Sequence, residues 1–209
     1  MELFYFGAKF MHPKALEPAI EKEIPVRIKN TFNPLEEGTL IGKEAQKYSE
    51  KVVKAITVIK DTGLINISGA GMSGTPGVAA KIFSILGEKN INILLISQSS
   101  SEANISIVIK RNDLEKAVNL LEIAFLGKEL VKEITFEDDV CIVSVVGAGM
   151  RGTIGVASRI FKAISEQKIN VRIIAQGSSE LNVSFVISEI DHIKAVKSLH
   201  KEFKLNNEN

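Results

Sequence analysis

A four-residue run, GAGM, occurs twice in the sequence and limits what the chain can fold into. It spans Gly69–Met72 and returns as Gly147–Met150, 78 residues further on. The same offset aligns the chain without a gap from Val53 to Phe125, and more than half of the positions between GAGM and the strands that follow it are identical. A period this long that occurs only twice predicts two copies of one small domain, not a solenoid of stacked repeats.

The composition is that of a globular chain that can bury a core, with 45% hydrophobic and 24% charged residues. A net charge of +1 does not favour nucleic acid or an anionic membrane as a partner. No apolar run approaches the ~20 residues of a membrane span, and Met1–Leu3 does not open a signal peptide. The single cysteine, Cys141, lies in the apolar run Val140–Val146, so we expect a buried strand residue and neither a disulfide nor a metal cluster. We expect a cytoplasmic protein.

Residues 1–50 differ from the repeats and hold four of the five prolines. The pattern predicts a short helix over Pro13–Glu23, a strand over Ile24–Lys29, a turn at Asn33 and a second strand over Thr39–Ile41. One helix and two short strands cannot bury their apolar faces alone. This part is therefore predicted to be the edge of a larger domain, joined to the repeats by the charged segment Lys43–Lys51 as a helix or a linker.

Each copy reads as strand, strand, helix, strand, strand, helix. In the first copy we expect strands at 53–59, 64–68, 91–97 and 104–110. We expect Pro76 at the first position of a helix that runs to about Glu88, and Asp113 as the N-cap of a second helix. The apolar residues that these helices turn to the core are expected to be Val78, Ile82, Phe83, Leu86, Leu114, Ala117, Val118, Leu121 and Phe125.

The second copy lacks the last strand that a βαββαβ unit needs at the edge of its sheet, since a polar tail follows Phe203. The first copy can use Leu130–Phe136 for this purpose. The only spare strand, Val53–Ile59, precedes the first copy, so we predict that it completes the second sheet by pairing within Val140–Ile187. The expected domains are then residues 1–50, residues 61–136, and residues 53–60 together with 137–205.

The repeat resembles the ACT domain, a ferredoxin-like module that binds amino acids and regulates metabolic enzymes, and the pair is similar to the tandem ACT domains of aspartate kinase. The opening is similar to the end of the aspartate kinase catalytic domain, which has the amino-acid-kinase fold. The motifs that carry this second likeness are Phe6-Gly7-Ala8-Lys9, His12-Pro13, Pro18-Ala19, Ile24-Pro25-Val26, Lys29-Asn30-Thr31, Asn33-Pro34 and Gly38-Thr39-Leu40. The resemblance implies an α+β chain: two ferredoxin-like ACT domains with an exchanged edge strand, preceded by a fragment of an amino-acid-kinase α/β domain.

The resemblance also implies that most of the catalytic machinery is missing. Aspartate kinases phosphorylate L-aspartate with ATP and Mg²⁺ in lysine, threonine and methionine biosynthesis, and they open with a phosphate motif of the type K-F-G-G-T-S that does not occur here. One matched nucleotide-contact position remains, Lys9 with Phe10. Phosphoryl transfer depends on positioning around the γ-phosphate, so we expect no catalytic residue, no cofactor and no kinase activity in this chain alone. We therefore expect either a regulatory fragment or subunit begun at an internal methionine, or an excised piece.

The glycine-rich stretches Gly69–Gly77 and Gly147–Gly155 read as G-x-G-x-x-G, so a dinucleotide site is one alternative. That site needs a parallel βαβ unit and an acidic residue ~20 residues further on, where the chain has Leu94 and Arg172. A second alternative is that the glycines only let strand and helix pack closely. We favour a third, in which free N–H groups at a helix start hold the carboxylate of an amino acid. These groups belong to Gly77, Val78 and Ala79, and to Gly155, Val156 and Ala157.

Gln98 and Gln176 end the strand opposite that helix start, and on spacing alone they could be plain surface residues. The runs ISQSSSE and IAQGSSE are similar to those of threonine-sensitive aspartate kinases, in which the matching glutamines contact threonine. Lysine-sensitive relatives tend to present an acid near position 94, where this chain has Leu94 and, in the second copy, Arg172. A buried ammonium without a counter-charge costs several kcal/mol, whereas a hydroxyl needs only a neutral partner. We therefore favour threonine over lysine.

The residues expected to contact the effector are Met72, Thr75, Gly77, Val78, Ala79 and Gln98, and Met150, Gly155, Val156, Ala157 and Gln176. The two methionines are equally good core residues. His12 is expected to pack or cap, His192 and His200 to be solvated, and no residue set has the spacing of a nucleophilic or zinc site. The implied partners are free threonine or lysine, a second copy of the chain, and a catalytic kinase subunit. The rival hypothesis is a dimerisation module with degenerate effector sites.

Overall fold

The computed structural model describes residues 13–41, 52–127 and 129–205. The predictions made for Lys9, Phe10, His12 and Lys43–Lys51 lie outside these ranges. Within them, no helix is both long enough and apolar enough to cross a membrane.

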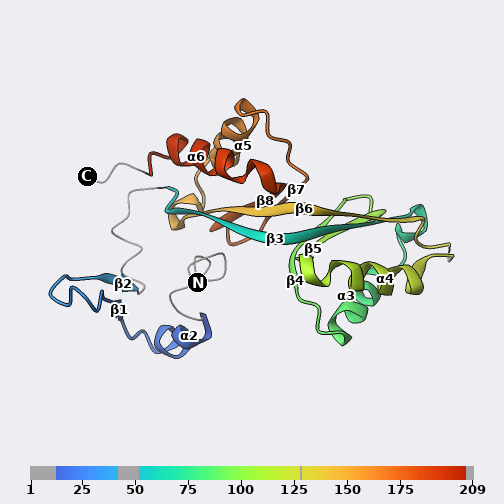
Figure 1. Ribbon diagram of the computed structural model, residues 1–209, viewed down its shortest axis with the longest axis horizontal. Helices are drawn as coiled ribbons and strands as arrows, with labels where there is room; N and C mark the ends of the chain where they lie inside the picture. Colours follow the sequence, from blue (N-terminus) through green and yellow to red (C-terminus); the bar gives the residue numbers. More distant parts are fainter. Residues whose placement is uncertain (1–12, 42–51, 128, 206–209) are drawn as a thin grey trace.

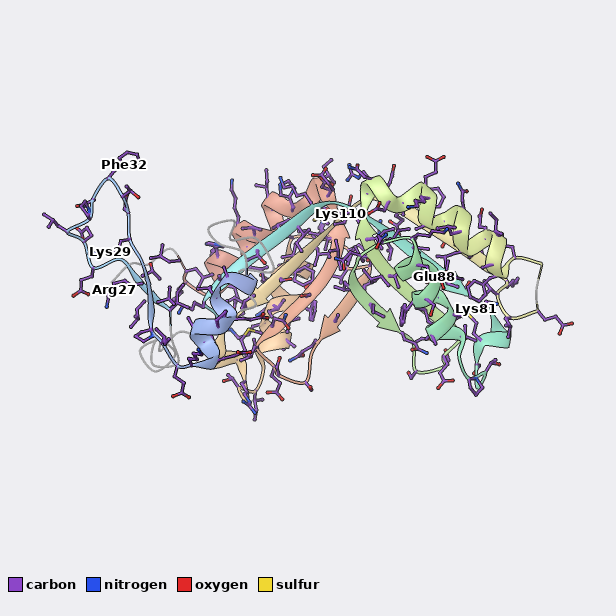
Figure 2. The ribbon with its side chains drawn as sticks, turned by 90° about the horizontal axis from the view of Figure 1, so that it is seen from below. Arg27, Lys29, Phe32, Lys81, Glu88 and Lys110 are labelled. Carbon is purple, nitrogen blue, oxygen red and sulfur yellow. The ribbon has the colours of Figure 1, made fainter. Side chains whose placement is uncertain are left out.

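The first part of the chain forms one helix, α2 (Pro13–Glu21), and two short strands, β1 (Val26–Ile28) and β2 (Thr39–Ile41). The strands pair antiparallel, with Val26 opposite Ile41. This agrees with the predicted elements, although both the helix and the first strand are shorter than expected. Phe32 projects from the loop between the strands and is 98% exposed (Figure 2). Such exposure agrees with a segment that cannot cover its own apolar side chains.

The two copies together form one six-stranded sheet in the order β4-β5-β3-β6-β8-β7, in which all neighbours pair antiparallel. Two long strands lie at its centre and run the length of both copies (Figure 1). The strands are β3 (Ala55–Ser68), β4 (Ile93–Gln98), β5 (Asn104–Lys110), β6 (Glu133–Val146), β7 (Ile173–Gln176) and β8 (Asn182–Ser188).

The predicted strand exchange is confirmed. Ala55 to Ile59 pair with Val146 to Ile142 in the second copy, and Leu64 to Ser68 pair with Glu137 to Glu133 in the first. The prediction of separate strands at 53–59 and 64–68 is wrong, because β3 continues through both. The backbone bends at Asp61, whose φ is +54°, and the pairing register shifts on either side of Thr62. A bulge of this kind bends a strand and leaves it in the sheet.

Four helices cover the sheet, two from each copy. They are α3 (Val78–Glu88), α4 (Leu114–Phe125), α5 (Val156–Glu166) and α6 (His192–Glu202). The pair α3 and α4 lies on one side of the sheet at one end, and the pair α5 and α6 lies on the other side at the other end (Figure 1). Short 3-10 turns precede them: η2 (Ala70–Met72), η3 (Arg111–Asp113), η4 (Ala148–Met150) and η5 (Glu189–Asp191).

Two details of the helix starts differ from the predictions. Pro76 is not the first helical residue: α3 starts at Val78, and Gly77 is its N-cap. Asp113 stands at the N-cap of α4 but makes no capping hydrogen bond through its side chain, because the 3-10 turn before it already has helical backbone angles. The expectation that His192 is solvated is wrong as well, since its ring is half-buried and its Nδ1 lies 2.6 Å from the Glu189 carbonyl oxygen.

Each copy has its own core between helices and sheet, and a third core joins the two. Side chains alternate between the faces of a strand, so Ile107 of β5 points toward the helices of its copy while Val108 points away from them. The third core lies on the faces turned away from the helices and contains Leu64, Leu95, Val108, Val140, Ile142, Ile173 and Val186. The two copies are therefore one body with a shared interior.

Candidate functional site

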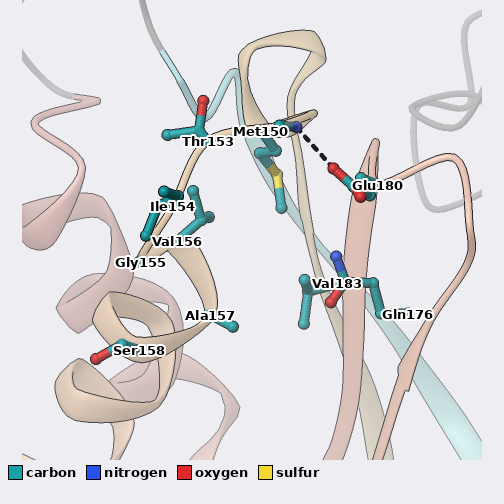
Figure 3. Close-up of a pocket in the computed structure, with 11 residues that line it drawn as sticks. Met150, Thr153, Ile154, Gly155, Val156, Ala157, Ser158, Gln176, Glu180 and Val183 are labelled. Atoms are coloured by element: carbon teal, nitrogen blue, oxygen red, sulfur yellow. Dashed lines mark hydrogen bonds between the residues drawn. The ribbon is translucent and has the colours of Figure 1, made fainter.

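A pocket of about 430 Å³ lies beside the start of α5 in the second copy. The turn 150–155 and the first residues of α5 form one wall, and the ends of β7 and β8 form the other (Figure 3). Its lining residues are Met150, Gly152, Thr153, Ile154, Gly155, Val156, Ala157, Ser158, Gln176, Glu180 and Val183. All five second-copy residues predicted to contact an effector are in this set.

The first glycine of the motif has a packing role. A Cβ on Gly147 would overlap the Val52 carbonyl oxygen and lie 2.8 Å from the Val53 Cα, and one on Gly69 would lie 2.8 Å from the Lys132 backbone nitrogen. The backbone of residues 52–54 or 130–132 passes too close for any side chain. These glycines do allow close packing, but against a neighbouring backbone segment and not between strand and helix as the close-packing alternative supposed. The dinucleotide alternative is contradicted, because the strands before and after the motif, β6 and β7, are not neighbours: β8 lies between them and pairs antiparallel with both. A Rossmann site needs a unit of adjacent parallel strands.

The last glycine of the motif opens the helix toward the pocket. Gly155 is the N-cap of α5 with φ +86°, and its equivalent Gly77 has the same angle. The first helical hydrogen bond runs from the Arg159 N–H to the Gly155 carbonyl oxygen. Earlier N–H groups of a helix have no partner inside it, and no side chain caps this end. Backbone N–H donors at the positive end of the α5 helix dipole therefore line the pocket wall.

The threonine of the turn is used internally. The Thr153 hydroxyl donates to the Gly149 carbonyl oxygen at 2.6 Å, and the Thr75 hydroxyl donates to that of Gly71 at 2.8 Å. Both bonds fix the turn between the 3-10 segment and the helix. Thr75, predicted as an effector contact, therefore already has an intramolecular partner for its hydroxyl.

The opposite wall comes from the last strand pair. Gln176 ends the edge strand β7 and pairs with Val183 of β8, and both side chains line the pocket. Met150 is 4% exposed, belongs to the core of its copy and also lines the pocket. Its place in the core is confirmed, and its contact with an effector stays a prediction. In the first copy, Met72, Val78 and Gln98 occupy the matching places at η2, at the start of α3 and at the end of β4.

Glu180 is one of six pocket residues that sequence reasoning missed, and it is the charged one of the six. Its Oε2 accepts a hydrogen bond from the Gly152 N–H at 2.6 Å (Figure 3). In the first copy, Glu102 accepts one from the Gly74 N–H at 3.0 Å. The signal was available, because this glutamate recurs at the offset of the repeat. Gly152, Thr153, Ile154, Ser158 and Val183 also line the pocket and were not predicted to do so.

Arg172 has a different place from the one assumed in choosing between threonine and lysine. Its side chain is not part of the pocket lining, and its Nε donates to Glu137 Oε2 at 2.9 Å. Over the described ranges, no group of three or more His, Cys, Asp or Glu residues is placed to hold a metal ion.

The sequence model of the ACT domain matches residues 65–125 and 143–203, which are the two copies defined by the repeat. The chain belongs to the ACT-domain family. One half of a long central strand completes the sheet of each ACT domain: residues 55–59 of β3 pair in the second domain, and residues 133–137 of β6 pair in the first. The pocket lies in the second domain. The boundaries predicted at residues 53, 61 and 137 stay predictions.

The tandem ACT region is homologous to the regulatory regions of aspartokinases. It is 40% identical to the bifunctional aspartokinase/homoserine dehydrogenase of Haemophilus influenzae over 96% of the chain, but it spans only 25% of that protein. The aspartate kinase of Clostridium acetobutylicum superposes with a TM-score of 0.83 at 32% identity, over 97% of this chain and 46% of that one. The ligand-free regulatory subunit of aspartate kinase from Thermus thermophilus superposes with a TM-score of 0.64 at 26% identity, over 73% of this chain and 98% of that one.

Proposed function

We propose that this chain is the amino-acid-sensing region of an aspartate kinase and that it binds an end-product amino acid, threonine, for feedback inhibition. The observation that carries the proposal is the pocket of the second ACT domain, where the start of α5 faces Gln176. Its volume lies within the range of small-molecule sites, ~300–1,000 Å³. Relatives that include a regulatory subunit of aspartate kinase support the assignment of the region.

The chemistry of the two walls suits threonine. The unpaired N–H groups at Val156 and Ala157 suit its carboxylate, because a helix N-terminus favours negative charge. The Gln176 amide offers both a donor and an acceptor to a hydroxyl. The apolar part of the lining, Met150 and Val183, suits the methyl group.

Lysine is the second candidate, and one observation favours it. Glu180 places a carboxylate in the pocket lining, which a lysine ε-ammonium could use. Arg172 no longer counts against lysine, because it pairs with Glu137 away from the lining. The choice between the two ligands therefore depends on which ammonium group Glu180 meets.

The effector would act by favouring one of two arrangements of the complete enzyme. A ligand can shift such an equilibrium only by its difference in affinity for the two states. We place ATP, Mg²⁺ and the aspartate site in a catalytic region outside this chain, because the K-F-G-G-T-S type of motif does not occur in it. A coupled assay with ATP and aspartate is expected to give no turnover from the chain alone.

Calorimetry with threonine, lysine and methionine tests the proposal on the full chain. We expect binding of threonine, and Gln176→Ala should weaken it about tenfold, since a lost hydrogen bond in a binding site costs ~1–1.5 kcal/mol. Gln98→Ala tests the first domain in the same way. Gln167→Ala is the matched control, because Gln167 ends α5 outside this pocket. Absence of heat from all three amino acids would contradict the proposed sensor function. Unchanged threonine affinity in both glutamine variants would show that the two glutamines do not contact the effector.

A dimerisation module is the alternative function. It is favoured by Ile96 and Ile174, equivalent residues on the outer strands β4 and β7 that are 46% and 50% exposed. Edge strands with apolar side chains are suited to pairing with a second copy. Sedimentation of the chain with Ile96→Glu and Ile174→Glu tests this. A dimer lost in these variants, together with no heat from threonine, lysine or methionine on the wild-type chain, would favour assembly over sensing.

A further inference from the structure

The pocket carries opposite charge on its two walls. One wall presents the N-terminus of α5, which is the positive end of the helix dipole. On the other wall, Glu180 is the only charged side chain among the described residues of the lining. Figure 3 shows its carboxylate beside Gln176 and across the pocket from the helix start. A ligand with a negative and a positive group close together fits this arrangement.

The Glu180 carboxylate is held in place and can still accept further hydrogen bonds. Its Oε2 accepts the Gly152 N–H, and the Glu180 N–H donates to the Gly177 carbonyl oxygen at 3.0 Å. An ionised carboxylate has about four acceptor positions, so one hydrogen bond leaves most of them open. Along the described ranges, no lysine, arginine or histidine forms an ion pair with Glu180. The carboxylate is therefore positioned on the pocket wall without a counter-charge.

The first domain repeats this geometry. Glu102 accepts the Gly74 N–H, and both glutamates have φ +57°. The facing turns that supply these N–H groups differ at other positions, for example Ser73 against Arg151 and Pro76 against Ile154. A left-handed backbone conformation is unfavourable for a residue with a Cβ. Both copies nevertheless keep a glutamate at this position, and in both its carboxylate contacts the facing turn.

We infer that Glu180 binds the α-ammonium group of the amino-acid effector and that Glu102 does so in the first domain. This inference rests on the proposed sensor function and deepens it. The ligand then spans the pocket, with its carboxylate at the start of α5 and its ammonium at Glu180, and its side chain lies toward Gln176. With the acid occupied by the α-ammonium, the lining has no second acid for a lysine ε-ammonium, and a neutral side chain is selected.

The test compares L-threonine with its 2-hydroxy analogue, 2,3-dihydroxybutanoate, in which a hydroxyl replaces the ammonium. Calorimetry is done on the wild-type chain and on Glu180→Gln, which keeps an acceptor for the Gly152 N–H but removes the charge. We expect wild type to prefer threonine by about tenfold or more, and Glu180→Gln to bind threonine about tenfold more weakly while its affinity for the analogue is unchanged. Glu102→Gln reports on the first domain in the same way.

Glu166→Gln is the charge-matched control, because Glu166 lies at the far end of α5, outside the pocket lining, where it pairs with Lys162. Equal threonine affinity in wild type and Glu180→Gln would overturn the inference and leave the sensor function in place. Equal losses for threonine and the analogue would also overturn it, because they would mean that Glu180 only holds the turn. Absence of binding by threonine, lysine and methionine to wild type would overturn the sensor function, and this inference with it. The comparison of threonine with the analogue on the wild-type chain needs no variant, so it tests the ammonium contact even if Glu180→Gln does not fold.

Discussion

The thiol of Cys141 has its chemistry set by its place on a strand. Cys141 lies opposite Ile187 in the pairing of β6 with β8 and is fully buried. Burial, followed by the negative charge of Glu189, raises the pKa of the thiol to about 12. The thiolate is the reactive form of cysteine. The folded protein should therefore keep this side chain protonated and inert at ordinary pH.

Two measurements check this residue. At pH 8 a thiol reagent should leave the folded chain unlabelled and should label it once in urea, and fast labelling of folded protein would contradict the burial. The raised folded pKa also makes stability depend on pH. An unfolded cysteine has a pKa of about 8.5, so the stabilisation of the fold by the buried thiol is complete below that pH. It falls as pH rises toward 12, because within that window the unfolded chain has lost the proton and the folded chain has not. The difference in unfolding free energy between wild type and Cys141→Ala should shrink over that window.

Single glycines in the turns between strand and helix, and inside the helices, are expected to have different effects on stability. Gly147→Ala should destabilise the fold by about 3 kcal/mol, because the new Cβ would overlap the backbone at Val52 and Val53. Gly155→Ala has no atom within 4 Å of the new Cβ, so its cost is the left-handed φ of +86° alone, ~1 kcal/mol. Gly87→Ala, also unobstructed and inside α3, should stabilise by ~0.5 kcal/mol.

Urea unfolding followed by circular dichroism gives this order directly. The ranking itself is the prediction: Gly147→Ala lowest, then Gly155→Ala, then wild type, then Gly87→Ala. A Gly147→Ala variant as stable as Gly155→Ala would mean that the close approach of the neighbouring chain is not what the first glycine is needed for.

Most of the helices and strands could be predicted from the sequence, because each one occurs in both copies and its pattern could be compared between them. The exchanged strand followed from counting strands, and the buried helix faces followed from spacing. The continuity of β3 could not be predicted, because Asp61-Thr62-Gly63 reads locally as a turn while hydrogen bonds from both neighbouring strands hold it in the sheet. Within the site, the helix start and Gln176 were predicted, whereas Glu180 was not, since its role depends on a left-handed loop backbone that places its carboxylate against Gly152.

The whole molecule is organised about contacts between equivalent positions of the two copies. The buried Thr62 hydroxyl donates to the Val140 carbonyl oxygen at 2.7 Å, and Arg111 forms an ion pair with Glu189, each 78 residues away in sequence. At the second pair the copies carry opposite charges. Two first copies placed against each other would bring arginine against arginine, so the pair favours the union of a first with a second copy.

Exchanging these charges tests whether the two ACT domains unfold as one body. Arg111→Glu or Glu189→Arg alone places like charges together at a half-buried site and should lower the unfolding free energy by ~1–2 kcal/mol. The double exchange should recover most of this, but not all, because the carboxylate introduced by Arg111→Glu would then face Asp61, which now lies 3.9 Å from the arginine. Each variant should keep a single urea transition with an unchanged m-value, since the two copies share the six-stranded sheet and the third core. Two transitions in either single variant would mean that the copies are independently stable.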